Sequence, residues 1–227
     1  MSAAAWSPDA ATLARGNALQ GAIPYAGGSE ITSTLEATQK AISGPVRTFA
    51  GWIRTWPGVT SAGMRRSPAK PATPGRRRDI HEEGRAVDAM MGNYGSPLAN
   101  QQGDALAAFL VRHADLLRVQ GVIWRRTEWF SSRNGPAWEP YNGPDDHVSH
   151  LHVEFSPEVL TWSEADMQAR IREVLASPAR RSPWRTAARA AAVVAGGALL
   201  VWAVTEWLRT RDAPSPALPD ASSRRAL

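Results

Sequence analysis

The sequence contains no cysteine, and only Lys40 and Lys70 among its 26 basic residues are lysines. The absence of cysteine excludes disulfides, cysteine-ligated zinc, iron–sulfur clusters and thiol nucleophiles. The first 25 residues contain no basic stretch followed by an apolar run, so we expect no Sec-type signal peptide. The formal net charge of +5 is small for a dedicated nucleic-acid-binding protein, and we expect no nucleic-acid partner.

Residues 1–56 are interpreted as an N-terminal helical region of unknown role. The run Ser7-Pro8-Asp9 resembles a helix N-terminus, with Ser7 as the cap, and predicts a helix to about Leu19. A second helix could open at residues 27–30 and run to about Ile42. Six basic residues and three prolines between residues 64 and 78 predict an exposed loop.

Residues 57–177 form the predicted central domain, of class α+β. Apolar periodicity predicts strands at 87–91, 119–124 and 150–155, and helices at 104–117 and 163–176. Residues 131–146 are rich in Gly, Pro and Asn and predict a loop.

The last quarter of the chain has a different composition. We predict a basic linker at 178–189, a transmembrane helix at 190–208 and a disordered tail at 209–227. The uncharged run 190–204 would span only about 22 Å as a helix, but flanking arginines and nearby tryptophans are typical of a membrane span. The protein is therefore expected to be membrane-associated through one C-terminal span of open orientation. The alternative is a buried or interfacial Ala-rich helix.

Four of the five histidines fall in two short stretches, 81–90 and 145–155. His150 and His152 are two residues apart on a predicted strand, so their side chains should share one face, and His147 precedes them in a loop. His81 and Asp88 are seven residues apart with Gly84 between them, which suits a loop that brings two ligands to one ion. Two imidazoles and a carboxylate leave a fourth position for water, as in catalytic zinc sites. The alternative is ordinary polar strand residues; His113, on an apolar helix face, is interpreted as structural.

The segment His81-Glu82-Glu83-Gly84-Arg85-Ala86-Val87-Asp88 resembles the His-x-x-Gly-x-Ala-x-Asp motif of the M15 metallopeptidases. These enzymes are D-Ala-D-Ala carboxypeptidases and dipeptidases and phage L-Ala-D-Glu endopeptidases. The ending His-x-x-His-x-His at 147–152 resembles a wider group that includes penicillin-insensitive murein endopeptidase and the Hedgehog signalling domain. Segments 103–110 and 119–125 and the Trp129 region are similar to a C-terminal module of actinobacterial and phage cell-wall hydrolases. The resemblance covers roughly residues 59–156.

The resemblance implies a small antiparallel sheet with flanking helices that carries a Zn2+ site. By position, His81, Asp88 and His152 would be the zinc ligands. His150 would be the catalytic or oxyanion-stabilising imidazole, with His147 in support.

Two further roles are less closely tied to the motif. Arg65 or Arg66 would meet a substrate carboxylate, unless both belong to a solvated loop. Many relatives carry Asp or Glu three residues before the last zinc ligand, where this chain has Ser149. The general base could then be Asp146, which matches the acidic residue of the Hedgehog-type arrangement, or His147 or His150.

The leading functional hypothesis is a zinc peptidase that hydrolyses peptide bonds in peptidoglycan stem peptides or cross-links through metal-activated water. The pattern leans towards an endopeptidase over a D,D-carboxypeptidase, and a phage or a bacterial origin stays open. The alternative is a non-catalytic zinc-binding module that holds a cell-wall peptide or a protein partner. A third hypothesis is a membrane-anchored structural protein of a phage or secretion apparatus.

Overall fold

The computed structural model describes residues 4–30, 42–64, 75–131 and 137–176. All of them belong to the first of two compact units, Met1–Ser182. The predicted linker, membrane helix and tail lie outside the described residues, as do Arg65 and Arg66. Within the described ranges, no helix has both the length and the apolar character needed to cross a membrane.

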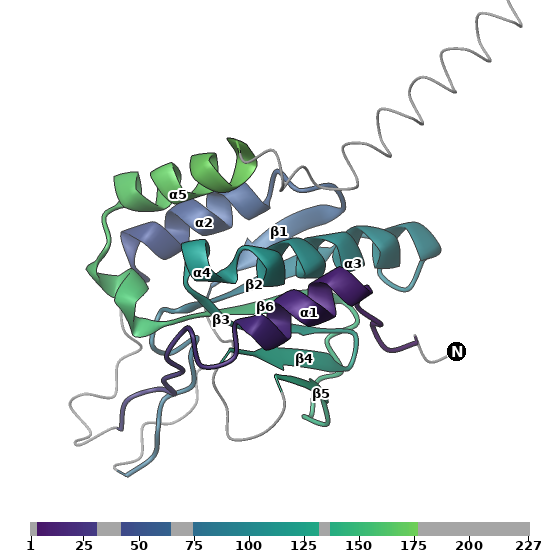
Figure 1. The fold of residues 1–227 in the computed structure, drawn as a ribbon, viewed down its shortest axis with the longest axis horizontal. Helices are drawn as coiled ribbons and strands as arrows, with labels where there is room; N and C mark the ends of the chain where they lie inside the picture. The colour runs from purple at the N-terminus through teal and green to yellow at the C-terminus, as the bar shows by residue number, and fades with distance from the viewer. Residues whose placement is uncertain (1–3, 31–41, 65–74, 132–136, 177–227) are drawn as a thin grey trace, which may run out of the picture. The chain divides into compact units, whose positions relative to one another are not determined.

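The centre of this unit is a six-stranded sheet in which every neighbouring pair is antiparallel (Figure 1). Its spatial order is β1-β2-β6-β3-β4-β5, so the last strand in the sequence lies in the middle, between β2 and β3. The strands are β1 (Val59–Gly63), β2 (Ala86–Met91), β3 (Val119–Trp124), β4 (Thr127–Phe130), β5 (Trp138–Pro140) and β6 (His150–Phe155). The predicted α+β class with an antiparallel sheet is confirmed.

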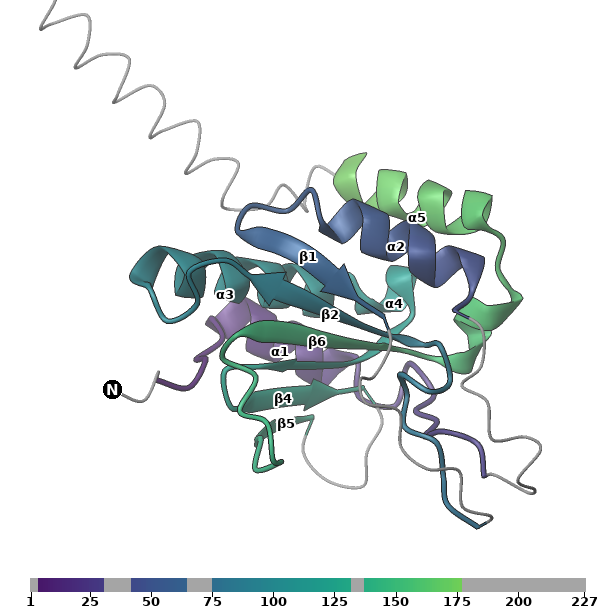
Figure 2. The same ribbon diagram turned by 180° about the vertical axis from the view of Figure 1, so that it is seen from behind.

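The helices gather on one face of this sheet, and Figure 2 shows the opposite face towards the viewer. Helix α2 packs on β1 and β2, α3 packs on β3, and α5 packs against α2. The helical elements are α1 (Ala10–Ala18), α2 (Gly44–Ile53), α3 (Pro97–Arg112), α4 (Ala114–Leu117), the 3-10 helix η2 (Pro157–Thr161) and α5 (Glu164–Ala176).

The side chains of strand β6 alternate between the buried core and the open face of the sheet, where the site lies. Leu151, Val153 and Phe155 are completely buried, and the Phe155 ring contacts Phe49 of α2, with ring centroids 4.8 Å apart. Successive side chains of a strand point to opposite faces, so His150, His152 and Glu154 project from the face that the helices leave open.

The predicted helix at 163–176 is present as α5 with a reciprocal cap. The Ser163 Oγ accepts from the Asp166 amide at 3.1 Å, and the Asp166 carboxylate accepts from the Ser163 amide at 2.8 Å. The predicted helix at 104–117 begins earlier, at Pro97, where the Ser96 hydroxyl accepts from the Ala99 amide at 3.2 Å. It is divided into α3, which ends at Arg112, and α4, which ends at Leu117 as predicted.

The predicted start of the first helix is wrong. Asp9, and not Ser7, caps α1, because its carboxylate accepts from the Thr12 amide at 2.7 Å. The preceding residues are held outside the helix, since the Trp6 amide donates to the Arg125 carbonyl at 2.9 Å.

Two other loop and helix predictions also need correction. Glu30, placed at the start of a helix, instead forms an isolated antiparallel bridge with Arg77, while residues 31–41 lie outside the described part. The predicted loop 131–146 contains the short strand β5, which pairs with β4.

Candidate metal centre

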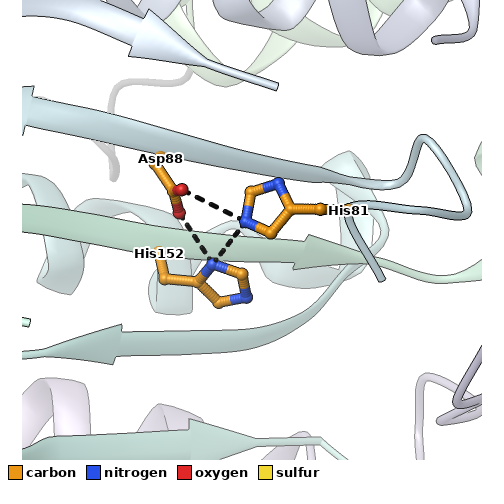
Figure 3. A group of neighbouring side chains, drawn as sticks. All are labelled: His81, Asp88 and His152. Atoms are coloured by element: carbon orange, nitrogen blue, oxygen red, sulfur yellow. Dashed lines mark hydrogen bonds and ion pairs between the residues drawn. The ribbon is translucent and has the colours of Figure 1, made fainter. Parts of the chain in front are cut away.

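Three side chains on the open face converge on one point (Figure 3). The Nε2 atom of His81 lies 3.2 Å from Oδ2 of Asp88 and 3.2 Å from Nδ1 of His152. The Nδ1 atom of His152 lies 2.8 Å from Oδ1 of Asp88. Each residue thus presents one donor atom to the same small volume, and they form a group able to hold a metal ion.

Strand register and one tight turn bring these residues together. Asp88 of β2 is directly opposite His152 of β6, and directly opposed residues on one face of an antiparallel pair are close neighbours. His81 lies in the turn that leads into β2, where the Gly84 amide donates to the His81 carbonyl at 2.9 Å. Gly84 has a φ of 72°, in the left-handed region that glycine adopts without strain.

The donor set fits zinc. Two imidazole nitrogens and one carboxylate oxygen are ligands that catalytic zinc sites use, and they leave a fourth position for water. Glu154 orients the ring of His152 on the side away from Asp88 and His81. Nε2 of His152 lies 3.3 Å from the Glu154 carboxylate and can only donate there. The lone pair of neutral His152 is therefore on Nδ1, the atom that faces Asp88 and His81.

The centre favours positive charge. Burial by itself would raise the pKa of Asp88, but hydrogen bonds with His152 and His81 outweigh it and hold that pKa well below its usual range. Burial would lower the pKa of His152, but its hydrogen bonds to Asp88 and Glu154 raise it to about 10. The negative charges of Asp88 and Glu154 therefore stabilise a proton or a metal cation at His152.

His147 and His150 lie beside the three converging residues. Their ring centroids are 4.7 Å apart, and the ring of His147 is 5.7 Å from that of His152. Nε2 of His150 lies 3.9 Å from Oδ1 of Asp88, while its Nδ1 lies 3.2 Å from the Ser149 hydroxyl. Burial and the neighbouring His152 and His150 lower the pKa of His147 to about 4, so its imidazole is neutral at neutral pH.

The four histidines line a cavity of about 790 Å³. One side of its lining comes from the N-terminal segment, through Tyr25, Gly27 and Gly28. Two arginines of the turn region also line it, and both are tied to that segment: Arg77 donates to the Gly28 carbonyl at 3.0 Å, and Arg78 to the Ser29 hydroxyl at 2.9 Å. The remaining lining residues include Asp79, Ile80, Met90, Ile123, Phe130, Tyr141, Pro144, Asp145 and Glu154.

The structure brings His81, Asp88, His147, His150 and His152 together but not Asp146. The Asp146 carboxylate pairs with Arg126 at 3.0 Å and lines a separate hollow with residues 140–145. Its neighbour Asp145 instead faces the histidines, with Oδ2 3.9 Å from Nε2 of His150.

Sequence reasoning also missed Glu154 and the two lining arginines. Glu154 follows His152 by two positions in the same strand, so the alternation that pairs His150 with His152 also indicated it. Arg77 and Arg78 were noted only as part of the basic loop 64–78, and their place in the cavity depends on the distant segment 25–29.

Comparison with known proteins gives one family. A family model described as "VldE, C-terminal domain" matches residues 34–152, more than half of the 227 residues. The chain belongs to this family. The VldE match includes the three converging residues and both neighbouring histidines. It ends before Glu154 and begins after the cavity-lining residues Tyr25, Gly27 and Gly28. No curated protein matches the chain. No solved structure matches it either.

Proposed function

We propose that this protein is a zinc-dependent peptidase that hydrolyses peptide bonds in peptidoglycan stem peptides or cross-links. The observation that carries the proposal is the convergence of His81, Asp88 and His152 beside two further imidazoles in an open cavity. The resemblance of the segments 81–88 and 147–152 to M15 metallopeptidases supports the same reaction and the same substrate class.

The chain's own residues can perform the remaining tasks of such a reaction. A zinc ion held by His81, Asp88 and His152 would supply Lewis-acid activation of water and of the scissile carbonyl. His150 would accept a proton from the water and pass it to the leaving amine, because its Nε2 faces the centre near Asp88. The Ser149 hydroxyl would orient that ring through Nδ1. The neutral imidazole of His147, whose Nδ1–H donates to the Asp145 carbonyl at 2.7 Å, packs beside the ring of His150 and would help to keep that ring in place.

The cavity offers a small peptide two arginines as well as the carboxylates of Asp79, Asp88, Asp145 and Glu154. Its volume of about 790 Å³ is within the range of ligand sites, and Arg77 and Arg78 contribute positive charge to its lining. Stem peptides carry free carboxylates, which arginine binds through paired hydrogen bonds. We also propose that residues 190–208 attach the protein to a membrane, and this part of the proposal rests on the sequence alone.

One observation favours the alternative of a zinc-binding module without turnover. Ser149 stands where many relatives have a carboxylate base, and its hydroxyl cannot act as a base at neutral pH. In the described residues, the acidic side chains nearest to the imidazole of His150 are Asp88 and Asp145, each 3.9 Å from its Nε2. In this alternative the cavity would hold a cell-wall peptide or a partner's peptide and release it unchanged.

The deciding experiment uses the full-length protein loaded with zinc. Purified peptidoglycan is incubated with wild type, with His152→Ala and with a matched pair of variants, Asp88→Asn and Asp146→Asn. We expect wild type and Asp146→Asn to bind zinc tightly and release new amino groups, and the other two variants to lose both the tight zinc binding and the hydrolysis. The masses of the fragments identify the bond. Tight, stoichiometric zinc binding without hydrolysis would establish the binding module, and tight zinc binding that survives His152→Ala at wild-type affinity would overturn the metal centre.

A further inference from the structure

We propose that Asp145, His147 and His150 form a second divalent-cation site next to the first, and that zinc bound there inhibits the peptidase. The first part stands on the geometry of these three residues. The second part, inhibition, rests on the proposed function, because it concerns the proton carried by His150.

The three side chains present a metal donor set of their own. One ligand atom from each lies within 4.8 Å of the others. The ring Nδ1 of His147 lies 2.7 Å from the Asp145 carbonyl, which can only accept, so the lone pair of neutral His147 is on Nε2. Two imidazoles and a carboxylate suit zinc and neighbouring transition metals and suit calcium or magnesium poorly.

Backbone geometry places these donors at a fixed spacing. His147 has a φ of 51°, and its amide donates to Oδ1 of Asp145 at 3.0 Å. This bond leaves Oδ2 of Asp145 facing Nε2 of His150 at 3.9 Å. Nε2 of His150 also lies 3.9 Å from Oδ1 of Asp88, which belongs to the first group. The two groups of donors are therefore neighbours.

The spacing of the donors predicts the order of filling. In the first group the donor atoms are 2.8 to 3.2 Å apart, so small outward shifts would give the about 3.3–3.6 Å that separates tetrahedral zinc ligands. In the second group Oδ2 of Asp145 and Nε2 of His150 are 3.9 Å apart and must move closer. The Asp145 side chain is 58% exposed, and the conformational entropy lost when a metal draws it inward opposes binding. The second site is therefore weaker than the first.

Occupation of the second site has a chemical consequence. A metal ion bound to Nε2 of His150 takes the lone pair that would accept a proton from water. The imidazole then cannot transfer protons, whatever occupies the first site. Hydrolysis should therefore rise with zinc while the first site fills and fall while the second site fills.

The first test is metal stoichiometry of the full-length protein, measured by equilibrium dialysis against zinc with elemental analysis. Wild type should bind two zinc ions per chain in two affinity classes. Asp145→Asn keeps an oxygen for the His147 amide but removes the charged ligand, so the weaker class should lose about tenfold or more in affinity. The matched control Asp146→Asn changes the adjacent carboxylate, which pairs with Arg126, and should keep both classes. A single zinc per chain at saturation, or a weaker class unchanged in Asp145→Asn, would overturn the site.

The second test is the zinc dependence of hydrolysis, with each variant normalised to its own maximum. Wild type and Asp146→Asn should be inhibited over the zinc range that fills the weaker class, and Asp145→Asn should need about tenfold more zinc. Equal inhibition of all three proteins would refute the inhibitory role. A wild type that binds two ions but never hydrolyses peptidoglycan would refute the proposed function and leave the second site standing.

Discussion

Glu154 would influence the candidate metal centre through its contact with His152. Its carboxylate accepts from Nε2 of His152, and its other oxygen accepts from the Gln120 side chain at 3.1 Å. Gln120 in turn bonds both backbone groups of Ala26, each at 3.2 Å. A histidine ligand held in this way has its tautomer and ring orientation fixed before the metal arrives.

Replacement of Glu154 by glutamine should weaken zinc binding by about 10- to 100-fold, because a neutral amide no longer holds the Nε2 proton as firmly. The measurement is competition for zinc with a chromogenic chelator. The control is Glu173→Gln on α5, whose carboxylate is exposed and lies 3.6 Å from Arg170. Wild-type affinity in both variants would show that Glu154 does not position His152.

Among the helices and strands, α3 packs closely on β3 because Gly103, on the helix face that contacts the strand, has no side chain. A Cβ at Gly103 would overlap the indole of Trp124, which is fully buried and donates to Asp104 at 2.8 Å. Gly51 of α2 is the opposite case: it is exposed, and in the described structure nothing lies within 4 Å of its Cβ position. The two glycines should therefore respond differently to the same change.

Gly103→Ala should lower the free energy of unfolding by about 1–3 kcal/mol, because the added methyl group displaces a rigid, bonded indole. Gly51→Ala should raise it by about 0.5–1 kcal/mol, since alanine loses less backbone entropy in a helix. Urea unfolding followed by circular dichroism measures both. A stabilised Gly103→Ala would mean that α3 does not approach β3 as closely as the structure shows.

The elements differed in how visible they were in the sequence. Strands β2, β3 and β6 were predicted because each is a buried run of apolar or alternating residues. Strand β1 was missed because its residues are half-exposed and small, and β4 was missed because it has only four residues. Helix α2 was missed although Ser43 caps it before Pro45, a signal that was present locally.

At the scale of the whole domain, Arg85 joins segments that are far apart in the sequence. Arg85 is 2% exposed, and its guanidinium donates to the carbonyls of Ala26 at 2.9 Å and Gly27 at 3.1 Å, and also to that of Phe155. Burial lowers the pKa of Arg85, and the charges of Glu83 and Glu154 partly oppose that effect. The cavity-lining N-terminal segment is thereby fixed to the end of β6.

Arg85→Met should lower the free energy of unfolding by about 2–4 kcal/mol, because buried carbonyls lose their donor while the side-chain volume is kept. The control Arg54→Met, at the exposed end of α2, should stay within about 0.5 kcal/mol of wild type. Chemical unfolding of the three proteins measures the difference. Equal stability would show that the N-terminal segment is held by other contacts.

The spacing of residues in the sequence was enough to predict that His81, Asp88 and His152 lie close together. The period of a strand places His150 and His152 on one face, and a glycine between His81 and Asp88 permits the turn that returns to β2. The sequence therefore indicated the donor atoms and, in the absence of cysteine, their chemical type.

Only the tertiary structure decided what surrounds those donors. Asp145 faces the histidines and Asp146 does not, because Arg126, from the turn between β3 and β4, pairs with Asp146. The N-terminal residues line the cavity because Arg85 and Gln120 bond them across more than fifty positions of sequence. Local periodicity fixes the face on which a side chain lies, whereas the partner it meets there depends on long-range packing, which has no local signature.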